Sequence, residues 1–137
     1  MSDSTQQERK TRTITLTDRA PVKIAEEDWP VIAHGSYYDH DGQVAAQANR
    51  SWRCTIRVRQ HEDGRSIVYG TYDYHTTWQG ARGADGRAGE LLAAGDDLVG
   101  AIRRTAATLD AITGGEYTAH IGEAERSCIA DLPAEEI

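Results

Sequence analysis

The sequence has no phenylalanine, only two lysines and two cysteines, and no long apolar run. Because no stretch approaches the roughly 18 apolar residues that a membrane-spanning helix needs, we expect no such helix. The polar N-terminus also lacks the apolar core of a secretory signal. We therefore expect a cytoplasmic protein with a flexible leader over residues 1–12, one domain over 13–132 and an acidic tail over 133–137.

The two cysteines, Cys54 and Cys128, are too far apart for a zinc knuckle, and in a reducing compartment we expect two thiols and no disulfide. Each lies in an apolar pattern, Cys54 in a strand and Cys128 in a helix, so we expect both to be buried thiols. The histidines have no recognised metal-ligand spacing. They are His34, His40, His61, His75 and His120. We expect no metal and no other cofactor.

Charge is unevenly distributed along the chain. The net charge is −7, which disfavours a general nucleic-acid coat. Residues 1–49 carry −3, residues 50–87 carry +3 and residues 88–137 carry −7. This division into a basic middle and an acidic C-terminal part is the most informative functional feature of the sequence.

Alternation of apolar and polar residues predicts several strands in the first part of the chain. Short strands are expected over 13–17, 22–24, 31–38 and 44–50, and a longer hairpin is expected over 52–74. The dipeptide Asp41-Gly42 predicts the turn of the first hairpin.

In the longer hairpin, Asp63-Gly64 predicts a two-residue turn that pairs Val58 with Tyr69. A slip of one residue would exchange the faces of one strand, so the prediction of the two faces depends on this turn. The predicted core face holds Trp52, Ile56, Val58, Ile67 and Tyr69, and the predicted outer face holds Arg53, Arg57, Arg59, Val68, Tyr72 and Tyr74.

A glycine-rich connection is expected over 75–89, followed by helices over 98–112 and 118–130. Asp96 or Asp97 is the expected N-cap of the first helix. Because strands precede helices, the sequence predicts an α+β fold, an antiparallel β-meander packed by one or two C-terminal helices.

The predicted arginine and tyrosine face has three interpretations. It is an ordinary sheet face, solvated or covered by the C-terminal helix, or it binds an acidic protein, or it binds nucleic acid through phosphate contacts and stacking. The residues for the nucleic-acid alternative are Arg53, Arg57, Arg59, Tyr72 and Tyr74.

The acidic C-terminal segment is the candidate surface for a basic protein partner, because complementary charge favours association. Alternatively, these acids only keep the protein in solution. The candidate residues are Glu116, Glu123, Glu125, Asp131, Glu135 and Glu136. The loop residues Trp78, Arg82 and Arg87 form a further candidate set.

No sequence motif of catalysis is present. The segment 80–86 lacks the Lys-Ser/Thr of a phosphate loop and the glycine spacing of a dinucleotide fingerprint. A nucleophile elbow and a kinase signature are also missing. We therefore expect a protein that is not an enzyme, although a small enzyme with an unrecognised site stays as an alternative.

Three segments carry a resemblance: KIAEEDWPVIA over 23–33, VRQHEDGR over 58–65 and CIADLP over 128–133. Together they resemble small accessory proteins of plasmids, phages and integrated elements in GC-rich Gram-negative bacteria. The resemblance implies a small binder that regulates or inhibits a host nucleic-acid-handling or defence complex, of the anti-restriction or anti-CRISPR type. The leading expectation is thus a protein-interaction module, with a nucleic-acid-associated regulator as the alternative.

Overall fold

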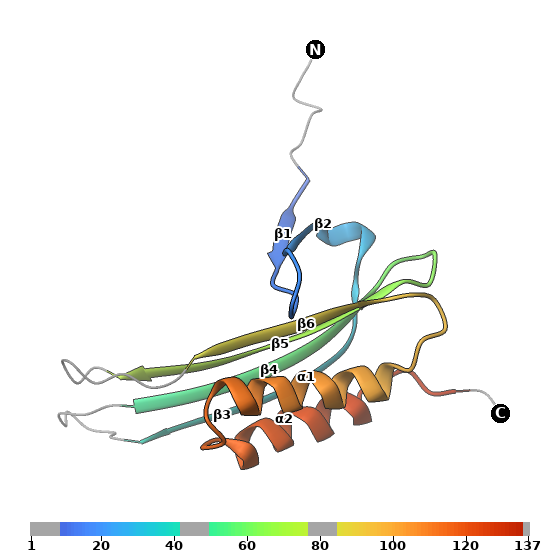
Figure 1. The fold of residues 1–137 in the computed structure, drawn as a ribbon. Coiled ribbons are helices and arrows are strands. Elements are labelled where there is room, and N and C mark those ends of the chain that lie inside the picture. The colour runs from blue at the N-terminus through green and yellow to red at the C-terminus, as the bar shows by residue number, and fades with distance from the viewer. Residues whose placement is uncertain (1–8, 42–49, 77–84, 136–137) are drawn as a thin grey trace.

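The computed structural model describes residues 9–41, 50–76 and 85–135. Figure 1 shows a long curved sheet with two helices against one face and a small β lobe standing on the other. The elements are β1 (Thr11–Ile14), β2 (Val22–Ala25), a short 3₁₀ helix (Glu26–Asp28), β3 (Val31–Asp41), β4 (Arg50–Gln60), β5 (Ser66–Thr76), β6 (Gly86–Leu92), α1 (Leu98–Ile112) and α2 (Thr118–Ala130).

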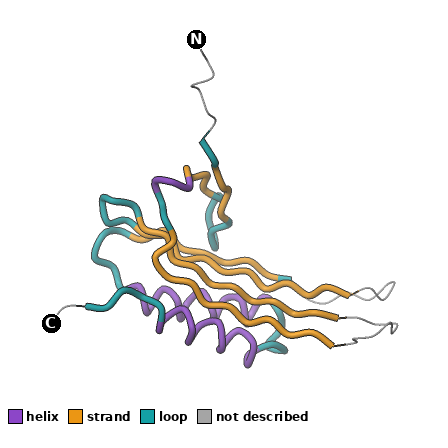
Figure 2. Tube along the Cα trace, turned by 180° about the vertical axis from the view of Figure 1, so that it is seen from behind, coloured by secondary structure: helices purple, strands orange, loops and turns teal. Residues whose placement is uncertain are grey.

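The main sheet is an antiparallel meander in the order β3-β4-β5-β6, and β1 and β2 form a separate two-stranded sheet. Both helices pack against the same face of the meander, as the view from behind also shows (Figure 2). The α+β prediction is confirmed. Neither helix is long and apolar enough to cross a membrane, and the described residues hold no other candidate.

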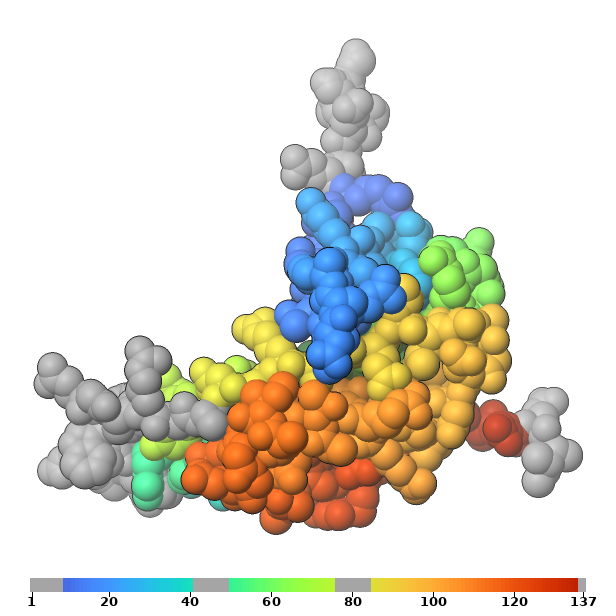
Figure 3. Space-filling view, in the orientation of Figure 1, coloured from blue at the N-terminus to red at the C-terminus, as the bar shows by residue number. Residues whose placement is uncertain are grey.

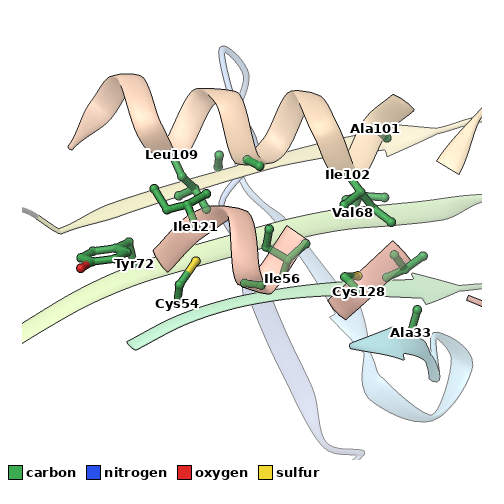
Figure 4. Close-up of a cluster of buried hydrophobic side chains, with 14 of the residues drawn as sticks. Ala33, Cys54, Ile56, Val68, Tyr72, Ala101, Ile102, Leu109, Ile121 and Cys128 are labelled. Atoms are coloured by element: carbon green, nitrogen blue, oxygen red, sulfur yellow. The ribbon is translucent and has the colours of Figure 1, made fainter. Parts of the chain in front are cut away.

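The main core lies between the meander and the helices (Figure 4). Alternate residues of β4 point into it, as predicted, and α1 adds the face expected from its apolar spacing. Fully buried members include Cys54, Ile56, Val58, Ile102 and Leu109. Burying a large aliphatic side chain stabilises the fold by about 1.5–3 kcal/mol, so this layer holds the helices on the sheet.

Gly35 in β3 allows α2 to lie directly on the sheet. A Cβ atom at this position would collide with the carbonyl oxygen of Ala124 and the amide nitrogen of Cys128. Only glycine therefore fits the crossing point of β3 and α2.

The register of the β4–β5 hairpin differs from the prediction by one residue. Val58 pairs with Val68 instead of Tyr69, and Gln60 pairs with Ser66. The connection is longer than a two-residue turn: the amide of His61 donates to the Arg65 carbonyl at 2.9 Å.

Two details of this longer connection stabilise it. Gly64 has φ +96°, a left-handed conformation that suits glycine. The carboxylate of Asp63 accepts hydrogen bonds from the Arg65 amide at 3.0 Å and from the Arg65 Nε at 2.8 Å. The extra residue exchanges the faces of β5, which is the slip that the sequence left open.

The N-terminal lobe, residues 9–29, covers one end of the face opposite the helices (Figure 3). A second buried cluster joins it to the sheet. This cluster comprises Ile14, Leu16, Ile24, Trp29, Ile67 and Tyr69. The chain crosses β6 closely at Gly89, where a Cβ atom would lie 2.6 Å from the Thr15 carbonyl oxygen.

The structure moves three predicted boundaries. The fold begins before residue 13, because β1 starts at Thr11 and Arg9 forms an ion pair with Asp28 at 2.7 Å. The glycine-rich connection ends earlier than expected, since Gly86–Leu92 pairs with β5 as β6. Arg50 belongs to β4, and most of the strand predicted over 44–50 lies outside the described residues.

Candidate functional site

The face of the meander away from the helices is the most distinctive surface of the described chain. Next to the N-terminal lobe it presents four cross-strand rows of side chains, which we call the open sheet face. The lobe covers part of the first row, at Tyr69 and Gly89. In order from the lobe outward, the register rows are His34, Arg57, Tyr69 and Gly89; Ser36, Thr55, Thr71 and Arg87; Tyr38, Arg53 and Asp73; and His40, Ser51 and His75. Neither the described helices nor the lobe cover the outer rows.

Three arginines give the open sheet face its charge. Within the described part of the chain, Arg57 and Arg87 have no carboxylate within ion-pair distance and no side-chain hydrogen bond. Arg53 lies over the ring of Tyr38, with its guanidinium carbon 5.3 Å from the ring centre. The positive charge is therefore available to a ligand.

The acidic side chains of this face stand away from the lobe. Asp73 lies in the third row, and Asp85 precedes β6, where its carboxylate accepts a hydrogen bond from the Tyr74 amide at 3.0 Å. The face is thus most positive in the first two rows, next to the lobe.

A notch of about 200 Å³ lies where the lobe meets these two rows. Three arginines from three separate strands line it: Arg12 of β1, Arg57 of β4 and Arg87 of β6. Hydroxyl-bearing side chains add donors and acceptors, and the remaining wall is sheet backbone. These lining residues are Thr13, Thr15, Tyr69, Gly70, Thr71 and Ala88. A notch lined by several arginines and hydroxyl-bearing residues suits a phosphate or carboxylate ligand.

Arg12 is the least free of the three arginines in the notch. Its Nε lies 3.2 Å from a carboxylate oxygen of Glu26. Its charge is therefore partly compensated within the lobe, whereas Arg57 and Arg87 supply uncompensated charge from the sheet.

Arg59, a predicted member of the outer face, is buried with only 6% of its surface exposed. Its Nε donates to the Tyr69 hydroxyl at 2.8 Å and its Nη1 donates to the Trp29 carbonyl at 2.9 Å. The lobe covers this end of the face, so Arg59 joins lobe to sheet and does not reach a ligand.

Tyr72 and Tyr74 lie on the helix side of the sheet and not on the arginine face. The one-residue difference in register turns them there. Tyr72 is fully buried, stacks on Tyr117 with ring centres 4.5 Å apart, and its hydroxyl lies 2.9 Å from Nδ1 of His120. Burial raises the pKa of Tyr72. The nucleic-acid set predicted from the sequence is therefore divided between the two faces.

The residues that replace the two tyrosines were missed by the sequence reasoning. Tyr38 is 54% exposed and comes from β3, and Arg12 comes from the segment expected to be a leader. Arg87 was grouped with the loop. Thr71 and Arg87 are paired in the register of β5 and β6. No short sequence motif predicts that register, so the sequence did not bring the two residues together.

The predicted acidic surface lies on the helix layer, opposite the arginines. Glu123 pairs with Arg126 at 3.2 Å, and Asp131 accepts a hydrogen bond from the His34 amide at 2.9 Å. Glu125 lines a groove of about 540 Å³ between α1 and α2. Glu116 and Glu135 are exposed. The C-terminal helix therefore covers the tyrosines and leaves the arginines uncovered.

The remaining candidates are resolved in part. Cys54 and Cys128 are fully buried, as predicted, and burial raises the pKa of Cys54 to about 12 and that of Cys128 to about 11. Trp78, Arg82 and Glu136 lie outside the described residues. Among the described residues no three histidine, cysteine or acidic side chains are grouped as metal ligands.

Comparisons with protein-family models, with curated proteins and with solved structures found no match to this chain.

Proposed function

We propose that the chain is a non-enzymatic binding protein whose open sheet face takes single-stranded nucleic acid. The observation that supports this most directly is the pair Arg57 and Arg87, two charged side chains on an uncovered sheet without a partner in the described residues. Guanidinium groups recognise phosphate through a planar fork of donors. Tyr38 beside Arg53 adds a ring on which a base can stack.

The composition of the face favours a polyanion over an acidic protein. Protein interfaces generally have an apolar centre with few charged residues. Apart from Asp73, Gly89 and the buried Tyr69, the four rows hold arginine, histidine, serine and threonine, and Tyr38 is the large exposed ring among them. Contacts to a phosphate chain need no apolar centre, since neutralising phosphates supplies the affinity.

The dimensions favour a single strand over a duplex. Four strands at about 4.8 Å spacing make a face about 14 Å wide before side chains are added. The major groove of B-form DNA is about 12 Å wide and admits a helix or a two-stranded ribbon. A broad sheet is better matched to an unpaired strand lying across it, with its bases accessible for stacking.

The net charge of −7 does not oppose this proposal, because several of the acidic groups belong to the helix layer, on the other side of the sheet from the first two rows. The helix layer contributes Asp110, Glu116, Glu123 and Glu125. An α-helix with its side chains is about 10–12 Å across, which exceeds the screening length of about 8 Å at physiological salt. Among the described residues, we therefore expect a polyanion to approach the first two rows of the open sheet face.

The test is the binding of a labelled single strand of about ten nucleotides, DNA and RNA in parallel, between about 50 and 200 mM salt. Each phosphate contact contributes about −0.7 to the slope of log affinity against log salt for single strands. We expect the triple variant R53Q/R57Q/R87Q to flatten this slope by about two units.

The matched control is R103Q, which removes an exposed arginine from the helix layer. It should leave both affinity and slope unchanged. If the strand does not bind, or if the triple variant and the control behave alike, the proposal is wrong. Excess duplex of the same sequence should compete poorly, and equal competition would contradict the preference for a single strand.

The acidic helix layer is the second candidate, now as a surface for a basic protein. The support is the exposed carboxylates of Glu116 and Glu123. The groove between α1 and α2 is lined by two acids, Asp110 and Glu125, and by two arginines, Arg103 and Arg126. A protein partner of a host nucleic-acid-handling complex, as the resemblance to mobile-element proteins implies, would use this side. The two candidates use opposite faces and can be tested by separate variants.

A further inference from the structure

The notch between the lobe and the sheet differs from the rest of the open sheet face in shape and in charge. It is a concave space of about 200 Å³ lined by Arg12, Arg57 and Arg87, whereas the outer rows form a sheet surface. At about 30 Å³ per water molecule, this space admits several waters and hence one tetrahedral phosphate group. We propose that the notch binds the terminal phosphate monoester of the strand that lies on the face, which rests on the proposed function.

The first support is the balance of charge. An internal phosphodiester carries one negative charge, whereas a phosphate monoester carries about −1.5 to −2 near pH 7 and has three acceptor oxygens. Arg57 and Arg87 have no partner among the described residues, and Arg12 is shared with Glu26. Two free guanidiniums and one partly compensated one match a dianion better than a single charge.

The second support is the position of the notch at the end of the face. The lobe covers β5 from Tyr69 in the first row to Ile67 in the next row, and both side chains are buried with Ile14 and Leu16. A hydrogen bond of 2.8 Å from the Thr17 amide to the Gly89 carbonyl holds the lobe against β6. The lobe therefore forms a fixed wall at this end of the face. A nucleic-acid strand that crosses the rows toward the lobe meets this wall, so we expect an end of that strand at the notch.

The third support is the supply of neutral donors. The hydroxyl side chains of Thr13, Thr15 and Thr71 line the notch together with the arginines. Hydroxyls donate to phosphate oxygens that the guanidiniums leave free. Among the described residues, the notch lining contains no carboxylate.

The experiment compares one oligonucleotide sequence of about ten nucleotides in three forms, with a 5′-phosphate, with a 3′-phosphate and with hydroxyls at both ends. We expect one phosphorylated form to bind about tenfold or more tightly than the hydroxyl form, the scale of one charge-assisted hydrogen bond. The two phosphorylated forms identify which end enters the notch. Inorganic phosphate should reduce the advantage of that form.

Variants separate the notch from the rest of the face. R57Q/R87Q should abolish the higher affinity of the phosphorylated form. R53Q, in the third row, should weaken the binding of all three forms by a similar factor, so that the ratio of the phosphorylated to the hydroxyl affinity stays the same. R57K/R87K keeps the charge but loses the planar fork, so it should retain strand binding and lose most of the preference. Thermal unfolding of each variant checks that the fold is intact.

The outcomes distinguish the two proposals. If all three forms bind equally and R57Q/R87Q weakens them equally, the strand-binding function stands and the terminal-phosphate site is wrong. If no strand binds but a phosphate monoester such as ribose 5-phosphate binds with loss in R57Q/R87Q, the notch is a phosphate site and the proposed function is wrong. If neither binds, both are wrong.

Discussion

Arg59 and Tyr69 meet under the N-terminal lobe, where the arginine Nε donates to the tyrosine hydroxyl at 2.8 Å. A buried guanidinium carries a charge, so each hydrogen-bond acceptor around it lowers the free-energy cost of burying that charge. We expect Tyr69→Phe to destabilise the fold by about 1.5–3 kcal/mol, the cost of losing a hydrogen bond to a buried charge. Denaturant unfolding measures this cost.

A second variant identifies the origin of that effect. Arg59→Met removes the buried charge, so adding Tyr69→Phe to it should cost little more. If Tyr69→Phe costs the same in both backgrounds, the hydrogen bond does not carry the stability.

Gly35→Ala should be severely destabilising, by more than about 4 kcal/mol, because its Cβ atom would collide with the backbone of α2 at Ala124 and Cys128. Gly122→Ala is the matched control. Its Cβ atom would meet only the flexible end of Arg126, and alanine favours a helix over glycine by up to about 1 kcal/mol. Opposite signs of the two changes in thermal unfolding are expected, and a tolerated Gly35→Ala would contradict the packing of α2 on β3.

Stability should fall at alkaline pH through the two buried thiols. Burial raises the pKa of Cys54 from 9.0 to about 12 and that of Cys128 from 9.0 to about 11. Below about pH 9 the two thiols are protonated in both the folded and the unfolded state, so their contribution to the free energy of unfolding is then fully present. Above it the unfolded state releases protons first, and stability falls by about 1.4 kcal/mol per pH unit for each thiol until the folded pKa is reached.

Unfolding at several pH values between about 8 and 11 measures this loss. Cys128→Ala should reduce the slope just above pH 9, while Tyr72, whose pKa burial also raises, continues to contribute at higher pH. The same two thiols should be unreactive toward an alkylating reagent in the native state. Rapid native alkylation or a flat pH dependence would show that they are not buried as described.

Tyr38→Ala should weaken strand binding by about 1–3 kcal/mol, the value of one base stacked on an aromatic ring. Tyr38→Phe keeps the ring and should bind like the parent protein. Fluorescence anisotropy with the same oligonucleotide compares the two variants. Equal binding by the alanine and phenylalanine variants would remove Tyr38 from the contact surface.

Neutralising the helix layer distinguishes the two candidate surfaces. The quadruple variant E116Q/E123Q/E125Q/E135Q should change strand affinity by less than about twofold at physiological salt, since none of the four residues belongs to the rows of the open face and salt screens charges that lie apart. If the acidic layer instead binds a basic protein, the same variant should slow that association and weaken its salt dependence. A large loss of strand binding would overturn the assignment of the surface.

Local sequence pattern predicted a large part of this fold. The helices over 98–112 and 118–130 have the predicted bounds, and the alternation of β4 placed Cys54, Ile56 and Val58 in the core. The α+β order also follows from the sequence. These features depend on the spacing of neighbouring residues, which is present in the chain before it folds.

The assignment of β5 to its two faces needed the tertiary structure. The connection at His61–Arg65 is longer than the dipeptide Asp63-Gly64 indicated, and one extra residue moved Tyr72 from the arginine face to the helix core. Packing decides between two such registers, because only one of them buries Val68 beneath α1.

The candidate site is likewise a product of tertiary structure. Arg12, Arg57 and Arg87 come from β1, β4 and β6, which are far apart in the sequence, and no spacing rule relates them. Arg59 has the same alternation as Arg57 in the sequence, yet the lobe buries one and leaves the other at the edge of the notch. The sequence determined which residues are charged and which strands carry them, and the docking of the lobe on the sheet decided which of those charges a ligand can reach.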